Sequence, residues 1–586
     1  MRMNVSLLLW SVLLALSLSN SSFAQNLEVI SLKKGVETSG SINLNTVGYT
    51  SWGIPQRRDP FSLFLTGNLN FTLFGYAAPF SFSYSNTNSS FSQPFNQFHF
   101  APQYKWIKTY IGNTSMTFSP YTLAGHMFFG GGVELTPAKW RIALMYGRLN
   151  KAVPFNLSDS LQHNKASFQR MGYGLKVGYE SNGEALTFNI FSAKDDPNSI
   201  PFVLSENKIT PQQNVAMGLA LRKKLSSKFF LNLEYSVSVL NTNTLGNTEH
   251  DTAHLKPTHN LLQGLLPQNS TTRSFDAFNG SIGYQVKQYS IQLKYERIAP
   301  EYQTLGAYYF NNDMRNITVI TNIRLLNNKI TLGTNIGVQE NNLDHSRTAT
   351  TSRTVGAATI QYVPNDKWNI SGNYSNFLSY TKNRSLSDPF YKNNLDTLNF
   401  YQVSQTTSVT ISRMLGTKEK PQSLMLTVSK QQAGNKAASE KDAQLSDFLN
   451  ANTSYSYSIP ASQLTLSIAA NMYSNNAAGS NTTFLGPGIN ATKTLLDKTL
   501  RCSYATSYNQ TTGNTPSSPI WNNQISFSYA PPQKKVGEKR EDENKRFIKG
   551  KNNFSVSFNI LKKLESIGTQ PSFTELTGTL NYSYSF

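Results

Sequence analysis

The stretch FTELTGTLNYSYSF, Phe573 to Phe586, alternates almost without exception between apolar and polar residues. Alternation with a period of two predicts a β-strand with one apolar and one polar face. The apolar set includes Leu580, Tyr582 and Tyr584 and ends on Phe586, whereas the other set consists of Glu, Thr, Asn and Ser. Such a strand needs water on one side and protein or lipid on the other.

The opposite end of the chain has the features of an export signal. A basic start at residues 1–4 precedes a mostly apolar run at residues 5–18, and small residues lead up to Ala24. This pattern predicts cleavage between Ala24 and Gln25, which gives a signal peptide over residues 1–24 and a short periplasmic segment over residues 25–37. The apolar run is short for a transmembrane helix, so we expect Sec-type export.

With these two ends, the chain resembles the outer-membrane β-barrel proteins of Gram-negative bacteria, whose assembly machinery reads a closing strand with a terminal Phe. The resemblance implies that Tyr582, Tyr584 and Phe586 are that signal, and that the protein lies in the cell outer membrane against lipid and lipopolysaccharide. Local sequences at residues 104–106, 132–137, 295–302 and 306–313 are similar to those of barrels from the Bacteroidota. Their aromatics suit either girdle and loop packing or a contact at the extracellular rim.

Composition agrees with a barrel. The mean hydropathy is −0.38, and no apolar stretch long enough for a transmembrane helix follows the signal. The chain nevertheless contains 29 Tyr and 35 Phe, enough for aromatic girdles at two membrane interfaces. Cys502 is the single cysteine, so no intrachain disulfide forms.

Short turns and longer loops alternate along the chain. This asymmetry is typical of outer-membrane barrels and predicts one all-β domain over residues 38–586, a transmembrane antiparallel β-barrel of about 22 to 26 strands. We expect the short turns to be periplasmic and the long loops extracellular. The clearest turns are at residues 136–139, 181–184, 326–329, 364–367 and 460–463, and the longest loops at 150–168, 195–213, 241–274, 379–400 and 431–450.

Alternation also assigns faces to individual side chains. In the strand near residues 229–239, Val237 is expected to face lipid and Ser236 the lumen, so that an arginine destabilises the barrel at Val237 and is mild at Ser236. The charges expected in the lumen are Lys176, Arg222, Lys294 and Arg501, which disfavour cations, with Glu180, Glu234 and Glu296 moderating that bias.

The formal net charge of +20 has several explanations. Nucleic-acid binding conflicts with export, so we expect no nucleic-acid partner. Contacts with lipopolysaccharide phosphates, a lumen that favours anions, and solvated loops all remain. The charged segment at residues 531–551 is expected on the periplasmic side, either as a solvated turn or as a docking segment for a partner.

Other sequence features suggest chemistry only weakly. His250, His254 and His259 share one loop, but no metal-binding motif accompanies them, so we expect solvated histidines and no metal or cofactor. Gly130, Gly131 and Gly132 are expected to permit close approach in a curved sheet, not to hold phosphate. No serine lies at a spacing that singles it out as a catalytic partner of His126, so we expect no hydrolase and no other enzyme.

Two functions follow from a barrel of this size. Its lumen is too wide for wall side chains to fill, so the first is a channel or translocation pore for solutes or macromolecules. The alternative is a non-enzymatic barrel subunit of a larger envelope complex for secretion or assembly, with a partner protein filling or covering the lumen. We expect the longest loop, residues 241–274, to fold inward or to hold that partner.

Overall fold

The computed structural model describes much of the chain and leaves gaps chiefly between strands. The described residues are 37–73, 76–86, 96–154, 166–200, 209–246, 266, 269–308, 311–346, 352–381, 400–435, 446–477, 480–513, 519–531, 550–564 and 572–586. The predicted signal peptide with its cleavage site at Ala24 and Gln25 lies outside these residues, as does most of the charged segment at 531–551. No helix in the described residues is long and apolar enough to cross a membrane.

The described chain is almost entirely β-strand. The first part contains β1 (Glu37–Trp52), β2 (Phe61–Leu73), β3 (Tyr76–Ser85), β4 (Gln97–Phe100), β5 (Gln103–Tyr104), β6 (Ile107–Thr117), β7 (Ala124–Leu135), β8 (Trp140–Asn150), β9 (Gln169–Ser181), β10 (Glu184–Asp196), β11 (Gln213–Lys224), β12 (Phe229–Asn241) and β13 (Thr272–Gln285). Short 3-10 turns follow β10 at Pro197–Ser199 and precede β22 at Pro460–Ser462.

The second part continues in the same way. It contains β14 (Tyr289–Ile298), β15 (Met314–Leu325), β16 (Ile330–Glu340), β17 (Ser352–Asn365), β18 (Trp368–Thr381), β19 (Phe400–Gly416), β20 (Pro421–Asn435), β21 (Ser446–Ile459), β22 (Leu464–Ala477), β23 (Ser480–Leu495), β24 (Leu500–Gly513), β25 (Ile520–Tyr529), β26 (Lys551–Lys563) and β27 (Phe573–Ser585).

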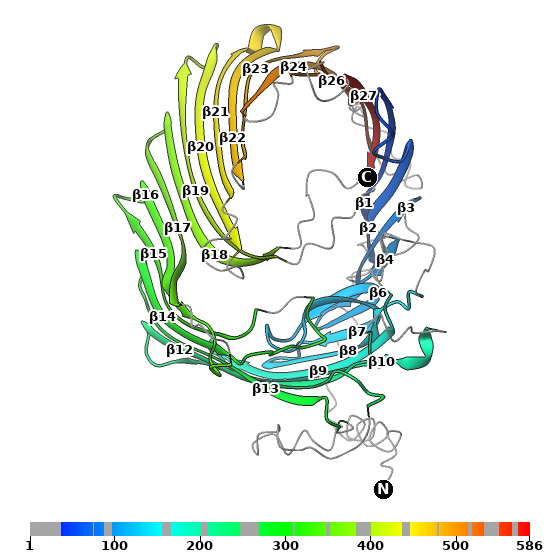
Figure 1. Cartoon of the computed structure of the whole chain (residues 1–586), viewed down its shortest axis with the longest axis vertical. Helices are drawn as coiled ribbons and strands as arrows, with labels where there is room; N and C mark the ends of the chain where they lie inside the picture. The colour runs from blue at the N-terminus through cyan, green and yellow to red at the C-terminus, as the bar shows by residue number, and fades with distance from the viewer. Residues whose placement is uncertain are drawn as a thin grey trace, which may run out of the picture.

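Apart from β4 and β5, which do not pair with each other, strands that are neighbours in sequence pair antiparallel, and β1 pairs with β27, so the sheet closes into the ring seen in Figure 1. The short strands β4 and β5 both lie between β3 and β6 and share one position in the wall. The result is a closed 26-stranded antiparallel barrel. The predicted all-β barrel of about 22 to 26 strands is therefore confirmed.

The two ends of the barrel differ as the sequence predicts. Tight turns join β9 to β10, β15 to β16 and β17 to β18, whereas the connection from β12 to β13 runs from Thr242 to Thr271. Asn182 and Gly183, which form the β9–β10 turn, have φ of 55° and 82°, values that Asn and Gly tolerate best. Because the strand number is even, the start of β1 and the end of β27 lie at the turn end, together with the β25–β26 connection that carries the charged segment.

Side chains alternate between an outer and an inner face of the wall. Tyr173, Phe188 and Tyr235 lie on the outer face and remain exposed. Their immediate neighbours in sequence point inward; Asn189 and Ser236, for example, are buried. An apolar outer face beside a more polar inner face is the pattern of a barrel whose outside meets lipid and whose inside meets water.

The glycine run in β7 permits close contact between neighbouring strands. A Cβ atom on Gly130 would lie 2.2 Å from the carbonyl oxygen of Tyr146 in β8, a distance that no side chain tolerates. This agrees with the expectation that the run serves packing in a curved sheet.

Candidate functional site: the inner wall and its plug

Two connections fold into the lumen and pack on the inner face of the wall. They are residues 118–123, between β6 and β7, and residues 299–308, between β14 and β15, and we call them together the plug. Tyr302 and Leu123 of the plug are fully buried, and they share one hydrophobic cluster with Met145, Leu149 and Phe191 of the inner face. The plug therefore has a protein-like core inside the barrel.

The two plug segments bind each other mainly through backbone oxygens. The Tyr302 hydroxyl donates to the Tyr121 carbonyl at 2.7 Å, and the Thr304 hydroxyl donates to the Thr122 carbonyl at 2.8 Å. A Cβ atom on Gly306 would lie 2.4 Å from that same Thr122 oxygen, so only glycine fits there. The segments form one unit.

Buried polar side chains attach this unit to the wall. The Leu305 amide donates a hydrogen bond to Oδ1 of Asn214 at 3.1 Å, and the Ser238 hydroxyl donates to the Gln303 carbonyl at 2.7 Å. The Thr122 hydroxyl likewise donates to Oδ1 of Asn189. Asn214, Ser238 and Asn189 are almost completely buried, so loss of any one partner would leave an unsatisfied polar atom.

Two glutamates on the wall accept hydrogen bonds from the plug. Ser119 donates to Glu234 on β12, and the Tyr121 hydroxyl donates to Oε1 of Glu296 on β14 at 2.5 Å. Burial and the adjacent Glu296 carboxylate raise the pKa of Tyr121 well above its ordinary value. Tyr121 therefore stays protonated and remains a donor to Glu296.

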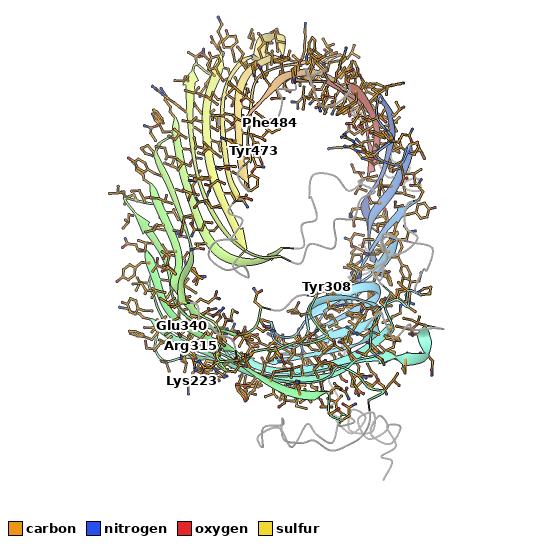
Figure 2. The ribbon with its side chains drawn as sticks, viewed as in Figure 1. Lys223, Tyr308, Arg315, Glu340, Tyr473 and Phe484 are labelled. Carbon is orange, nitrogen blue, oxygen red and sulfur yellow. The ribbon has the colours of Figure 1, made fainter. Side chains whose placement is uncertain are left out.

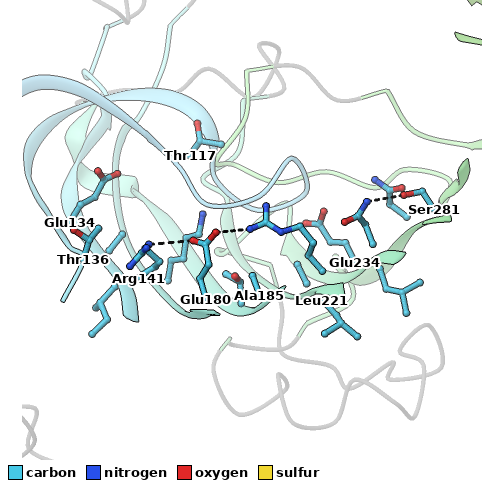
Figure 3. A pocket seen from close by; sticks show the side chains of 18 of the residues that line it. Thr117, Glu134, Thr136, Arg141, Glu180, Ala185, Leu221, Glu234 and Ser281 are labelled. Carbon is cyan, nitrogen blue, oxygen red and sulfur yellow. Dashed lines mark hydrogen bonds and ion pairs between the residues drawn. The ribbon is translucent and has the colours of Figure 1, made fainter. Parts of the chain in front are cut away.

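A cavity of about 690 Å³ opens on the inner face of β7 to β14, and Figure 3 shows the side chains around it. Three of the four predicted lumen charges, Lys176, Arg222 and Lys294, line it, together with Glu180 and Glu234. The alternation in the sequence thus correctly assigned to the lumen three cations that lie far apart in the chain and line the same cavity.

Ion pairs connect several of these charges. Arg222 Nη2 lies 2.7 Å from Oε1 of Glu180, and Lys294 Nζ lies 3.3 Å from Oε2 of Glu296. Arg141, which the sequence analysis missed, contributes a second contact to Glu180 at 3.3 Å. Because the Arg222 and Glu180 side chains are substantially exposed, we expect this pair to contribute at most about 1 kcal/mol to stability. The glutamates thus pair directly with predicted lumen cations.

The fourth predicted lumen charge lies elsewhere. Arg501 is the second residue of β24, at the turn end, and is not among the residues that line the cavity. It shares its face of the strand with Ser503, whose hydroxyl bonds to Ser526 of β25 across the inner wall. The predicted set is therefore divided between two regions of the barrel.

The structure corrects the expectation for Ser236 and Val237. Ser236 points inward as predicted, but it is only 1% exposed, so an arginine there is not mild. Val237 lies on the outer face directly opposite Asp276, whose carboxylate binds Arg297 at 2.8 Å. Val237 is thus close to a charged pair near the loop end, and it is a poor probe of the apolar band.

The loop at residues 241–274 is described only in part. His250, His254 and His259 lie outside the described residues. Leu266 is described, and it packs with Val215 and Val239 on the outer face. The inward position expected of this loop does not hold at Leu266. Among the described connections, those that enter the lumen are the two of the plug. The aromatic stretch around Tyr302 serves loop packing.

His126 also belongs to the plug region. Its ring stacks on Tyr308 with centroids 4.1 Å apart, and Nδ1 contacts the Met127 carbonyl at 2.7 Å. These contacts give it a packing role. Within the described residues, no group of three or more His, Cys, Asp or Glu is placed to hold a metal ion.

The closing strand makes the barrel's last pairing. Gly40 and Phe586 exchange backbone hydrogen bonds of 2.9 and 3.0 Å. The Tyr584 and Phe586 rings lie 5.6 Å apart, and Tyr582 packs on Phe554 at 4.7 Å and donates to Asn552. The three predicted signal residues therefore form part of an aromatic strip along β26 and β27.

Comparisons with known proteins assign the chain to no family. No protein-family model and no curated protein matches the chain. Among solved structures, the outer membrane protein OpdK from Pseudomonas aeruginosa is 8% identical, with 64% of this chain and 94% of that chain covered and a TM-score of 0.28. OccAB3 from Acinetobacter baumannii is 10% identical, with coverages of 69% and 99% and a TM-score of 0.28.

The P pilus usher PapC, described as a translocation pore, is 11% identical, with 93% of this chain and 99% of that chain covered and a TM-score of 0.36. At these identities and TM-scores, the likenesses carry no argument about this chain, and they do not support the resemblance to barrels of the Bacteroidota. The chain is assigned to no family.

Proposed function

We propose that this protein is an outer-membrane channel or translocation pore. The observation that carries the proposal is the division of the inner wall: the plug covers the sector around β6 to β15, whereas no buried hydrophobic side chain is described between Val355 and Phe573. The strands β19 to β26, which we call the open sector, present mostly Ser, Thr and Asn to the lumen. A wall of this kind is compatible with a water-filled passage.

The proposed setting follows from the two ends of the barrel. Export through a Sec-type route with cleavage between Ala24 and Gln25 would leave the turn end in the periplasm and the loop end outside, among lipopolysaccharide. N-terminal sequencing of the mature protein should begin at Gln25. An intact N-terminus on the membrane-inserted protein would contradict this route.

Reconstitution in a planar bilayer tests the pore directly. The purified, folded protein should give stepwise conductance, and its folded state is checked by heat-modifiable migration on a gel. A folded protein that inserts without conductance would contradict the pore and support the second function, a non-enzymatic subunit of an envelope complex with a partner in its lumen. Co-purification from membranes in mild detergent would then identify that partner.

The proposed assembly signal has its own test. Deletion of Phe586 removes the backbone pairing with Gly40 and one ring of the aromatic strip. If the barrel-assembly machinery reads this end, the inserted fraction should fall, while a Phe554→Ala variant, which alters the same strip away from the terminus, should insert normally. Normal insertion of the Phe586 deletion would remove the terminal residue from the signal.

A further inference from the structure

Among the described side chains on the inner wall of the open sector, which are mostly Ser, Thr and Asn, one group is aromatic. Phe448 of β21, Tyr473 of β22 and Phe484 of β23 stand on three adjacent strands, with ring centroids 6.2 Å and 5.9 Å apart. All three lie toward the loop ends of their strands. Figure 2 shows Tyr473 and Phe484 on the inner side of the wall. We call these three residues the aromatic ladder.

The inner position of the ladder also follows from its strand partners. Register places Asn450 opposite Tyr473, and on the same face Ser456 bonds to Ser467 at 2.8 Å. The opposite face of these strands carries the exposed apolar residues Leu466 and Ile468, which match the outer face elsewhere. The ladder is therefore not part of the outer aromatic belt.

The surroundings of the ladder are neutral. Below it on the same face, Asn452 donates to Asn471, and Ser458 bonds to Thr465 at 3.0 Å. Among the described residues on the inner face of β20 to β25, Arg501 is the one charged group, and it lies at the opposite end of its strand. Among the described side chains of this face, a charged ligand at the ladder would thus meet no adjacent opposite charge.

Tyr473 is 37% exposed, so its ring is accessible within the described structure. An accessible aromatic row offers flat apolar faces, and the neighbouring amides and hydroxyls offer both donors and acceptors. Carbohydrates combine the matching properties, because their rings have apolar C–H faces and hydroxyl edges. An aliphatic chain would not use the Asn and Ser groups, and an anion would find more suitable partners on the charged wall of β7 to β14.

We propose that the aromatic ladder is a binding site for neutral oligosaccharides that enter the lumen from the loop end. This inference rests on the proposed pore and adds a class of solute to it. The rings of Phe448, Tyr473 and Phe484 stack on successive sugar units, and Asn and Ser groups of the wall bond to their hydroxyls.

The experiment uses maltohexaose as the probe, in two formats. Interruption of the bilayer current measures binding during passage, and calorimetry on the detergent-solubilised barrel measures binding without any need for conductance. Tyr473→Ala should weaken maltohexaose binding about tenfold, whereas Tyr473→Phe, which keeps the ring, should stay close to the unmodified protein. Tyr504→Ala removes an exposed outer-face ring of β24 and should leave binding unchanged.

The outcomes separate this inference from the pore itself. Conductance without maltohexaose binding, or equal binding by Tyr473→Ala and the unmodified protein, overturns the ladder site and leaves the pore intact. Stronger binding of an oligogalacturonate of the same length overturns the preference for neutral sugars. Binding by calorimetry that is lost in Tyr473→Ala, without conductance, supports the ladder and contradicts the pore.

Discussion

The plugged sector and the open sector share one outer face but have different inner faces. Outside, Leu219 of β11 and Ile468 of β22 are equally typical of an apolar band. Inside, the plugged sector has small apolar residues that are fully buried, among them Ala193, Ala216 and Ala277, which leave room for the plug. The open sector has Ser, Thr and Asn instead. The type of residue on the inner face of a strand therefore indicates whether that face contacts protein or water.

The first way to test this difference is to remove a large ring from each sector. Tyr302→Ala empties the centre of the plug, and we expect it to lower the free energy of detaching the plug by about 3 to 5 kcal/mol. Tyr473→Ala removes an accessible ring and should cost far less stability. Hydrogen exchange of the plug amides and urea unfolding measure the two effects. Similar losses at both positions would mean that the open sector is also packed.

The outer face should respond alike in both sectors. Leu219→Arg and Ile468→Arg each place a charge in the apolar band, and each should destabilise the barrel by roughly 2 to 4 kcal/mol. Ser467→Arg, the inner-face neighbour of Ile468, is the matched control and should be mild because water is present. Reversible unfolding in lipid vesicles measures all three. A mild effect at one outer position alone would show that the sectors differ outside as well.

Alkaline pH should weaken the plug and leave the open sector unaffected. Burial raises the pKa of Tyr302 above its ordinary value of 10.0, so the buried ring stays neutral while a detached ring ionises. The detached state then binds fewer protons, and the stability of the plug falls as the pH rises past 10. Tyr302→Phe should reduce this fall by up to about 1.4 kcal/mol per pH unit. An identical pH dependence in that variant would assign the effect to Tyr121.

The smallest effect is expected on conductance. Replacing residues 300–308 with a short Gly-Ser linker uncovers the inner face around Asn214 and Ser238, but leaves the proposed path along the open sector unchanged. Conductance should therefore rise only modestly, with normal insertion. A closed pore that opens only after this replacement would show that the plug, and not the open sector, controls passage.

Local sequence patterns predicted the strands of the wall but did not predict the plug. The turn at Asn182 and Gly183 and the faces of Tyr173 and Phe188 follow from neighbouring residues, so alternation was sufficient. The plug depends on Tyr121 and Tyr302, which lie 181 residues apart in sequence and join segments without any period. The available signal was indirect: alanines at inward positions of neighbouring strands mark a surface that another segment covers.

The pairing of β1 with β27 gives the folding of this ring an unusual final step. Every other pairing is between strands close in sequence, but Asn45 and Asn581, which bond across this seam, are 536 residues apart. The entropic cost of closure grows slowly with chain length, by about 0.6 kcal/mol for each doubling, so distance does not prevent closure. It does make closure slow, and until then both edges expose unpaired backbone groups that are prone to aggregate. The exchange between Gly40 and Phe586 would thus convert an aggregation-prone ribbon into a barrel without edges.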